Sequence, residues 1–407
     1  MAVSVAIKIC YGYYIFVRWE KMFTMGREYL FKLIPRLQSQ KFGASQISRT
    51  LVLVNWENMG DFILFSAMIR ETKMNFPNSK LIVVAQKENA ELAHDCPYVE
   101  KWIWIKGHKN PKPGEGHGKE TSYLRKLVVT YFQLQFHGKR RIDFLLGPDW
   151  LLVTSLNQFV QNILFRKANQ KDLSLTFQGP VVLSRIRDHS HQVTRMCSIL
   201  EAFNIKVVSD EIENWLPLIS EPKDSRSGIV STAISRRVLV SLGAGQSRRN
   251  WPLERVRTLI DTLLAEYQDL EVTVIGPKSL ATEEVLSRFS NTKGIKSVIG
   301  QTDLSQVARF MKDSDLLISN DSGLVHLAAT FKLSTVVISA HPMNAEPWHL
   351  HSPNRYHPWK TRYKVLQPAE LIHPCRGSCQ APQAHCIESI DVVTVFEACK
   401  ELLDNNS

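Results

Sequence analysis

The sequence predicts an α/β protein built from two parallel sheets in series. Short apolar runs alternate with helical patterns along most of the chain, and this alternation is typical of parallel sheets. Residues 217–236, which are rich in serine, proline and charge, separate two such series and predict an interdomain linker. The chain has 407 residues, enough for two domains that each bury a core.

The first series of elements runs from about residue 49 to residue 216. Its first helix, from Phe62 to about Phe76, should end before Pro77. Residues 106–120 interrupt the pattern with Gly, Pro and Lys, and predict either a solvated insertion or a basic loop over an anionic substrate. Strands are expected at 49–54, 80–85, 102–105 and 142–146, and further helices at 89–94, 122–137, 155–165 and 191–203.

The second series begins after the linker. Pro252 should lie in the first turn of a helix that runs to about Glu266. Strands are expected at 238–242, 272–275, 295–299, 315–319 and 335–338, and further helices at 282–289, 303–311, 327–331 and 392–403. Two such series without an internal repeat predict two Rossmann-like domains that face a cleft.

Three loops follow strands at the expected carboxyl edges of these sheets, where such domains bind ligands. Loop 55–61 brings the carboxylate of Asp61 to a helix start, where it could act as a base or only cap the helix. Loop 243–250 offers glycine backbone and two guanidinium groups, which suit a diphosphate. Residues 319–329 connect a strand to a helix N-terminus, which predicts either an anion site or an ordinary capped turn.

The composition indicates a globular protein with an anionic partner. The formal net charge is +11, which fits a membrane surface, a phosphorylated ligand or nucleic acid. The seven cysteines are too scattered for a secreted disulfide framework, so a cytosolic setting is expected. In the N-terminal extension 1–48, residues 11–38 mix aromatic and basic side chains, as in a helix on an anionic bilayer. The alternatives are a helix packed on the domain, or a start codon assigned too early.

Three stretches carry a resemblance to a known family. They are Gly60-Asp61 after a strand, Gly243-Ala244-Gly245 followed by Arg249-Asn250-Trp251-Pro252-Leu253-Glu254-Arg255, and Asn320-Asp321-Ser322-Gly323-Leu324-Val325-His326-Leu327-Ala328-Ala329. In order and spacing they resemble glycosyltransferase family 9, the heptosyltransferase family of lipopolysaccharide core assembly. The resemblance implies the GT-B architecture, two Rossmann-like domains with parallel sheets facing a central cleft. Residues 49–216 would bind the acceptor, 237–389 the nucleotide sugar, and 390–407 would form a helix packing back on the first domain.

The resemblance also implies roles for single residues in an inverting glycosyl transfer that uses no metal and no cofactor. Asp61 would be the catalytic base that removes a proton from an acceptor hydroxyl. Arg249, where the family often has lysine, would contact the sugar-side phosphate, and Asp321 would contact the heptose hydroxyls. The other donor-binding residues would be Gly245, Ser322, Gly323 and Leu324, the last three through backbone amides, with Glu283 favoured over Glu284 for the ribose.

Two further groups carry no predicted chemistry. His326 is expected to pack or to form a hydrogen bond, not to act as an acid. The tail holds three thiols and two imidazoles, whose spacing matches no standard zinc finger, so structural or free thiols are predicted in place of a metal site. These residues are Cys375, Cys379, Cys386, His373 and His385.

The predicted function is transfer of heptose from ADP-heptose to a lipid-linked, phosphorylated lipopolysaccharide core acceptor at the cytoplasmic face of the inner membrane. One alternative is a family member that uses another nucleotide sugar for a different surface glycan. Another is a nucleotide-sugar-binding protein without catalysis. A nucleic-acid-binding protein would fit the charge, but no nucleic-acid motif supports it. The motifs identify a diphosphate far better than they identify the base, the sugar, the acceptor or the linkage.

Overall fold

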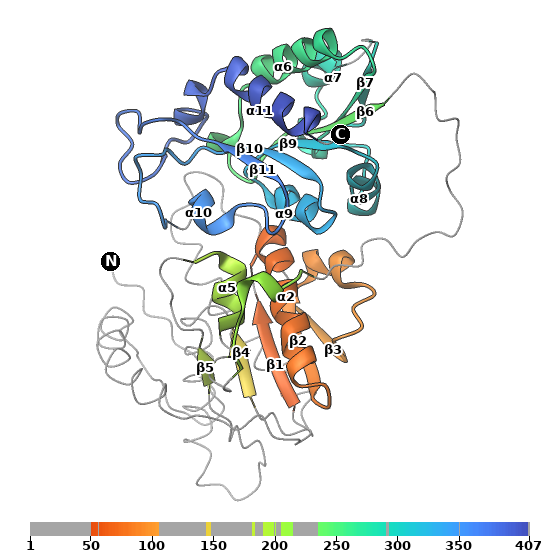
Figure 1. Ribbon diagram of the computed structural model, residues 1–407, viewed down its shortest axis with the longest axis vertical. Helices are drawn as coiled ribbons and strands as arrows, with labels where there is room; N and C mark the ends of the chain where they lie inside the picture. The colour runs from red at the N-terminus through yellow and green to blue at the C-terminus, as the bar shows by residue number, and fades with distance from the viewer. Residues whose placement is uncertain are drawn as a thin grey trace, which may run out of the picture.

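The protein folds into two lobes, each with one open parallel sheet, which confirms the predicted α/β class (Figure 1). The computed structural model describes residues 50–55, 57–105, 144–147, 181–183, 190–198, 200, 205–214, 235–289, 293–349 and 351–405. The predictions for residues 1–48, loop 106–120, helices 122–137 and 155–165, and most of linker 217–236 lie outside these residues.

The first sheet has the strand order β3-β2-β1-β4-β5. Its strands are β1 (Thr50–Asn55), β2 (Lys80–Gln86), β3 (Lys101–Ile105), β4 (Phe144–Gly147) and β5 (Val181–Leu183). Its helices are α2 (Met59–Asn75) and α5 (Gln192–Cys197), with 3₁₀ turns η1 (Lys87–Asn89), η2 (Glu91–Ala93) and η4 (Ser209–Glu211). The apolar run of β1 is fully buried because helices cover a parallel sheet on both faces.

The second sheet has the strand order β11-β10-β9-β6-β7-β8. Its strands are β6 (Arg236–Ser241), β7 (Leu270–Ile275), β8 (Ile295–Ser297), β9 (Leu316–Asn320), β10 (Ser334–Ile338) and β11 (Tyr363–Leu366). Its helices are α6 (Leu253–Glu266), α7 (Glu283–Phe289), α8 (Leu304–Lys312), α9 (Gly323–Thr330), α10 (Pro353–Tyr356) and α11 (Val392–Asp404), with 3₁₀ turns η5 (Ser247–Arg249), η6 (Lys278–Leu280) and η7 (Cys386–Ser389).

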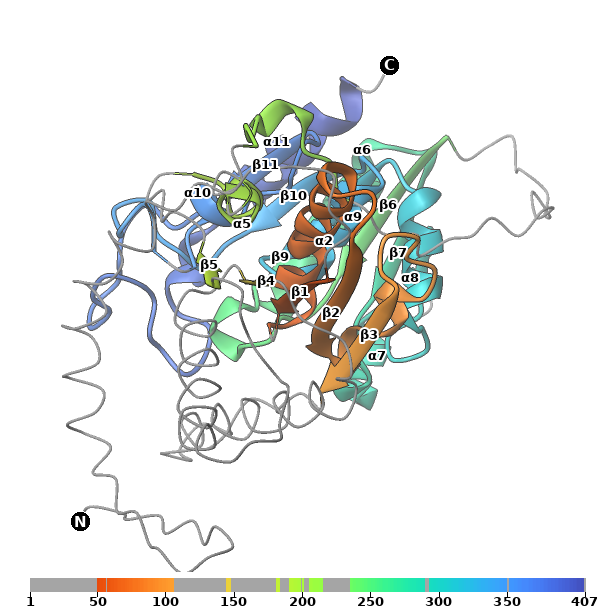
Figure 2. The same cartoon turned by 90° about the horizontal axis from the view of Figure 1, so that it is seen from below.

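In both sheets the strand order reverses beside the first strand, at β1/β4 and at β6/β9. Ligands of such sheets bind outside the carboxyl ends of the strands at this point. The three loops singled out in the sequence follow β1, β6 and β9. The topology therefore directs all three loops toward the region where the two lobes meet (Figure 1). In the view from below, α2 lies over α9, the helix against which it packs (Figure 2).

Helix boundaries differ from prediction at several places, and α9 shows a shift of four residues, since it begins at Gly323 and not at 327. Helix α2 begins at Met59, three residues before the predicted start, because the amide of Phe62 already donates to the carbonyl of Asn58. The expected helix at 89–94 is replaced by the 3₁₀ turns η1 and η2. Pro252 is the N-cap residue of α6 and precedes its first turn.

The prediction that residues 390–407 pack back on the first domain is corrected by the structure. Helix α11 lies against α6 and the strands β9 to β11 of the second lobe. Its apolar face is buried there, Tyr267 donates a hydrogen bond of 2.9 Å to the Asp404 carboxylate, and Lys400 pairs with Glu266 at 2.7 Å. The chain instead reaches the first lobe just after α10, where the indole of Trp359 donates to the carbonyl of Ile212 at 3.0 Å.

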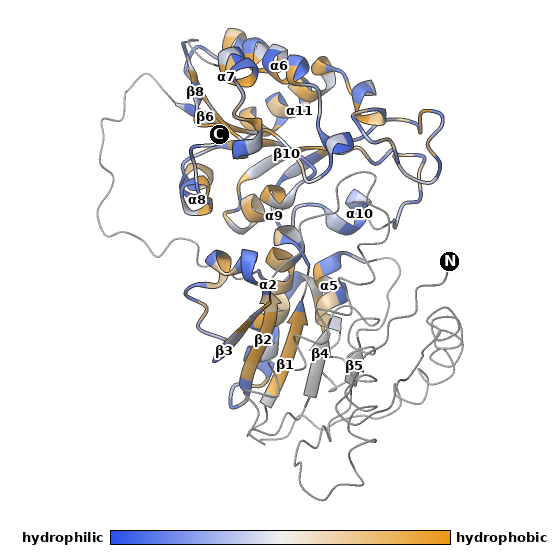
Figure 3. Ribbon diagram, turned by 180° about the vertical axis from the view of Figure 1, so that it is seen from behind, coloured by the Kyte–Doolittle hydropathy of each residue, from blue (hydrophilic) through white to orange (hydrophobic). Residues whose placement is uncertain are grey.

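The buried core crosses from one lobe to the other. One apolar cluster contains side chains of α2 together with Leu317 of β9 and Leu327 and Ala328 of α9. Helices α2 and α9 pack against each other, and Figure 3 shows the hydrophobic strands β1 and β2 directly below this contact. Within the described residues, no helix combines the length and the apolar character needed to cross a membrane.

Candidate active site

The N-termini of α2 and α9 meet where the two lobes join. A Cβ atom on Gly60 would lie 3.2 Å from the Cα of Gly323, and one on Gly323 would lie 2.6 Å from the Cε of Met59. Neither Asn58 nor Ser322, the two N-cap residues, makes a side-chain capping hydrogen bond. The first amides of both helices are therefore left for other acceptors, and an anion is the acceptor that two positive helix ends favour.

Asp61 lies in the first turn of α2, half-buried beside this junction. Its pKa is raised to about 7, mainly by burial and next by the negative charge of the nearby Glu57 carboxylate. The positive charges of Arg355 and Arg249 act in the opposite direction. A carboxyl group with a pKa near the working pH suits proton abstraction from a hydroxyl, because it is available as carboxylate and still binds a proton well.

Arg249 ends η5 and points toward the loop after β9. Its guanidinium lies 3.7 Å from the Asp321 carboxylate and donates to Nδ1 of His351 at 2.8 Å. Burial and the positive charge of Arg249 lower the pKa of His351 to about 4, so that the ring is neutral and can accept this bond. Burial raises the pKa of Asp321, and Arg249 opposes this shift. Arg249 is thus held in place by one neutral and one acidic partner.

Trp251 fixes the loop that carries Arg249. Its amide donates to the side chain of Asn320 at 2.9 Å, and its indole donates to the carbonyl of Ile390 at 2.9 Å. The side chain is only 2% exposed. The Trp251-Pro252 pair therefore joins the loop after β6 to the end of β9 and to the segment before α11.

The structure brings Asp61, Arg249 and Asp321 into one electrostatic neighbourhood, as the sequence predicted for residues on opposing lobes. The hydroxyl of Ser322 lies 3.3 Å from that of Ser319 and does not cap α9. The other predicted donor-binding residues at this helix, Gly323 and Leu324, form its first turn.

Two predicted residues are less closely tied to this group. Gly245 has open space where a side chain would be, with no atom within 4 Å of an added Cβ. Glu283 is exposed at the start of α7, and the described part of the chain gives it no hydrogen bond or ion pair. His326 packs its ring against Gly60, and burial lowers its pKa to about 4, which agrees with the predicted packing role.

Sequence reasoning missed the segment after β10, which forms a fourth loop at the same edge. Arg355 of α10 donates to the Gln192 side chain of α5 at 2.8 Å and lies close enough to lower the pKa of Asp61. Burial raises the pKa of its neighbour Tyr356, and the charge of Asp61 adds to this shift. The available signal was the capping pair Ser352-Pro353 and a concentration of histidines after a buried strand.

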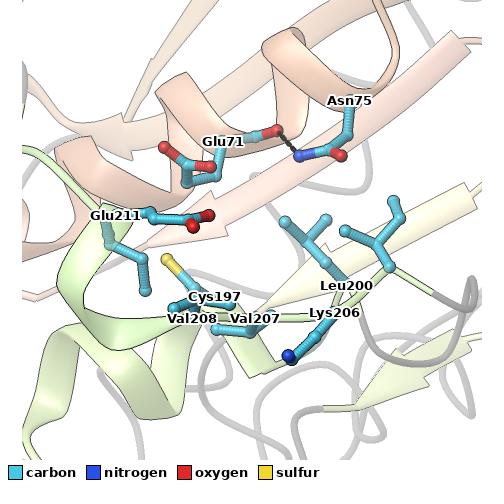
Figure 4. A pocket seen from close by; sticks show the side chains of 10 residues that line it. Glu71, Asn75, Cys197, Leu200, Lys206, Val207, Val208 and Glu211 are labelled. Carbon is cyan, nitrogen blue, oxygen red and sulfur yellow. Dashed lines mark hydrogen bonds between the residues drawn. The ribbon is translucent and has the colours of Figure 1, made fainter.

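A small pocket at the other end of α2 is separate from this site (Figure 4). It lies between Glu71 and Asn75 of α2 and the segment around Cys197, Lys206 and Glu211. Glu71 is ten residues beyond Asp61, which places it about 15 Å further along the helix. This pocket contributes no group to the junction of α2 and α9.

Two Rossmann-like lobes with parallel sheets, whose strand-end loops meet between them, have the GT-B architecture. The sequence profile of glycosyltransferase family 9 (heptosyltransferase) matches residues 166–383, more than half of the chain. The chain therefore belongs to glycosyltransferase family 9.

Solved structures share this fold, and a curated sequence is a distant relative. The chain is similar to a family 9 glycosyl transferase from Veillonella parvula, with 16% identity, a TM-score of 0.61 and coverage of 90% of this chain and 99% of the other. It is also similar to the Escherichia coli ADP-heptose lipopolysaccharide heptosyltransferase II, with 17% identity, a TM-score of 0.58 and coverage of 88% and 99%. A Haemophilus influenzae protein provisionally named a glycosyltransferase is 21% identical over 74% of this chain and 85% of its own length.

Proposed function

We propose that this glycosyltransferase transfers heptose from ADP-heptose to a lipid-linked, phosphorylated lipopolysaccharide core acceptor, with inversion and without a metal in the reaction. The observation that carries the proposal is the Asp61 carboxyl group, with a pKa of about 7, beside the uncapped start of α9. One lobe supplies a base for the acceptor hydroxyl. The other supplies amides and a guanidinium for the leaving diphosphate.

The proposed chemistry is a single displacement. As the acceptor oxygen attacks the anomeric carbon, its proton passes to Asp61 and the bond from that carbon to the diphosphate breaks. The negative charge that develops on the leaving phosphate is stabilised by the amides of Ser322, Gly323 and Leu324 and by Arg249. Attack from the side opposite the leaving group inverts the configuration of the sugar carbon.

The pairing of Arg249 with Asp321 suggests how the donor enters. A diphosphate would compete for the guanidinium, whose second partner, His351, is neutral. Asp321 would then be free to accept hydrogen bonds from sugar hydroxyls. Gly245 would allow close approach of the donor, and Glu283 would bind the ribose. Escherichia coli heptosyltransferase WaaC, with a TM-score of 0.51 to this chain, has been solved with ADP, which supports an adenine nucleotide donor.

The base assignment is tested with Asp61→Asn. This change keeps the size and polarity of the side chain but removes its ability to accept a proton. We expect transfer to fall by about 10²–10⁴-fold, the usual contribution of a general base, while donor affinity is retained. Glu57→Gln, a neighbouring carboxylate outside the proposed proton path, should retain transfer. Unchanged turnover in Asp61→Asn would refute the assignment.

The donor is tested by thermal shift with ADP-, GDP-, UDP- and dTDP-sugars. A ligand that binds only the folded state raises the melting temperature. At a ligand concentration of a hundred times its Kd, it adds about 2.7 kcal/mol to the free energy of unfolding. Stabilisation by ADP-heptose supports the proposed donor. Stabilisation by another nucleotide alone would favour the alternative, a family member that builds a different surface glycan. Donor binding without transfer to any acceptor would favour a non-catalytic binding protein.

We also propose that the protein lies peripherally on the cytoplasmic face of the inner membrane, with residues 1–48 as the membrane-associating extension before an acceptor domain at 49–216. The basic net charge and the basic aromatic segment 11–38 support this. Co-sedimentation with anionic vesicles should exceed that with neutral vesicles and should weaken with salt. Equal binding to both, or no loss on deleting residues 1–48, would refute the role of the extension.

A further inference from the structure

Three thiols and one imidazole converge in the tail that precedes α11. The ligand atoms of Cys375, Cys379, His385 and Cys386 all lie within 4.8 Å of one another. The Sγ atoms of Cys375 and Cys379 are 4.0 Å apart, and the His385 Nδ1 atom lies 3.5 Å from the Sγ atoms of both Cys375 and Cys386. These residues belong to none of the loops that form the candidate active site.

The spacing of these atoms matches the edges of a zinc tetrahedron. With Zn–S bonds of about 2.3 Å and Zn–N bonds of about 2.0–2.1 Å, the S···S edge is about 3.8 Å and the S···N edge about 3.6 Å. The Cys375–Cys379 sulfur separation of 4.0 Å and the two His385–sulfur separations of 3.5 Å agree with these edges within about 0.2 Å, and the remaining ligand atoms lie within 4.8 Å of one another. A disulfide between Cys375 and Cys379 would need its sulfurs about 2.05 Å apart, so the thiols are not placed for that bond.

The backbone around the cluster supports metal ligation. The amide of Gln380 donates to the Sγ of Cys375 at 3.5 Å, the kind of outer contact that orients and stabilises a metal-bound thiolate. Gly377, between the first two cysteines, has a φ of +69°, which allows the chain to turn back within four residues. Cys379 and Cys386 are buried, whereas His385 is half-buried.

We propose that Cys375, Cys379, His385 and Cys386 bind one structural zinc ion. Three thiolates and one neutral imidazole form a closed Cys₃His set, and four protein ligands leave no position for a substrate or a reactive water. On binding, each thiol releases its proton to solvent. The irregular spacing of the ligands, which in the sequence argued against a finger, is accommodated by the turn at Gly377 and by the adjacent pair His385-Cys386.

The proposed zinc would support the loop that carries Arg249. Cys386 begins η7, and η7 packs against η5, whose last residue is Arg249. Four residues after Cys386, the carbonyl of Ile390 accepts hydrogen bonds from Trp251 and Arg255. A zinc ion that fixes Cys386 would therefore stabilise η7 and the segment up to Ile390, which pack against η5 and Trp251. It would not contact the reacting groups.

The first test is the metal content of the full-length chain, purified without chelator from medium that contains zinc and iron. We expect one zinc per chain by elemental analysis. Replacing it with Co²⁺ should give the strong thiolate-to-cobalt and d–d absorption of a tetrahedral site. One iron per chain would support the four-ligand site but overturn its assignment to zinc. No bound metal in wild-type protein that takes up neither Zn²⁺ nor Co²⁺ would overturn the proposal.

Two histidines in the same tail provide a matched comparison. His385→Gln should lose the bound metal and the cobalt spectrum and should lower the melting temperature, whereas His373→Gln, an exposed residue outside the cluster, should keep all three. Chelator should lower the melting temperature of the His373→Gln protein and leave that of His385→Gln unchanged. Equal metal content in the two variants would overturn the ligand assignment. Because His385 is half-buried, its variant should fold, and circular dichroism confirms this independently of activity.

Discussion

At the scale of single residues, the environment of Asp61 favours the protonated carboxyl group. Its pKa of about 7 in the folded protein lies well above the ordinary value of 3.8, mainly because the group is buried and faces Glu57. Between these two values the folded state binds more protons than the unfolded state. The contribution of Asp61 to the free energy of unfolding therefore falls as pH rises from about 4 to about 7. At neutral pH and above, the ionised group destabilises the folded state.

This destabilisation by the ionised Asp61 carboxylate predicts that Asp61→Asn is more stable than wild type at pH 8. The amide cannot ionise, so the variant avoids the burial of a charge that wild type accepts above pH 7. The difference in melting temperature should shrink as pH is lowered toward 4, where the carboxyl group is neutral in the folded state and about half protonated in the unfolded state. Calorimetry at pH 5 and pH 8 measures this. A variant that is equally destabilised at both values would indicate a structural hydrogen bond in place of a strained catalytic group.

The pH dependence of transfer should follow the same group. A base must be ionised, so kcat/KM should rise with pH through about 7. Glu57→Gln removes a negative charge that raises the pKa of Asp61, so the acidic limb of this variant should move to lower pH. An acidic limb that stays in place in Glu57→Gln would show that another group controls the profile.

Arg249 and its neighbour Arg248 should differ sharply in their effect on the donor. Both side chains are half-buried, but Arg249 is held by Asp321 and His351, whereas Arg248 makes no hydrogen bond or ion pair with the described residues. Arg249→Met should weaken donor binding by about 10–150-fold, the equivalent of about 1.5–3 kcal/mol for a charged hydrogen bond. Arg248→Met should stay within about twofold. Isothermal titration with ADP measures both, and similar losses would mean that only the summed charge matters.

At the scale of elements, the contact between α2 and α9 depends on two glycines. An alanine methyl at position 323 would meet the Gly60 amide nitrogen at 3.0 Å and the Met59 side chain at 2.6 Å. Gly323→Ala should therefore destabilise the protein by about 1–3 kcal/mol, the usual cost of overpacking, and should reduce donor affinity. Gly245→Ala meets no atom and should leave stability unchanged. Urea unfolding of both variants measures this, and equal stability would mean that the helices separate without cost.

Element positions followed from sequence wherever burial was complete. The strand cores of β1, β6, β9 and β10 are continuous apolar runs, and such runs are placed by composition alone. Strand β11 was missed because it alternates Tyr363-Lys364-Val365-Leu366 at a half-exposed sheet edge, where composition is mixed. The positions of the three predicted loops were also correct, because each loop directly follows one of these buried strands.

The site could be predicted only in part. Asp61, Arg249 and Asp321 each follow a recognisable strand, so their convergence was accessible from topology. Arg355 lies near Asp61 because its segment packs against α5. This packing is a tertiary contact, and no local sequence pattern predicts it. The direction of α11 was wrong for a similar reason: its apolar face is evident in the sequence, but the surface that it covers is not.

At the scale of the whole molecule, the two lobes are joined by more than the chain connection. The apolar cluster of the first lobe continues through α2 into α9, β9 and α8 of the second. The carboxylate of Glu91 accepts hydrogen bonds from the amide and hydroxyl of Ser305, each at 3.1 Å, and Glu213 pairs with Lys332 and Lys360. Because such exposed ion pairs contribute little, the shared apolar packing must supply most of the coupling.

The side chain of Trp359 should control whether the lobes unfold together. It is 8% exposed, donates to the Ile212 carbonyl, and stacks on the ring of His191 with centroids 4.4 Å apart. Wild type should unfold in one calorimetric transition. Trp359→Ala should lose about 3–5 kcal/mol and split this transition in two, because it removes the packing that joins the segment after α10 to the first lobe.

Trp359→Phe and Met343→Ala separate this effect from a general loss of stability. The phenyl ring retains the stacking and loses the hydrogen bond, so the cost should be about 1 kcal/mol with a single transition. Met343, between β10 and α10, is 64% exposed, and its truncation should change neither stability nor cooperativity. A single transition in Trp359→Ala would show that the remaining contacts between the lobes, with the packing of α2 on α9 as the largest, couple them without Trp359.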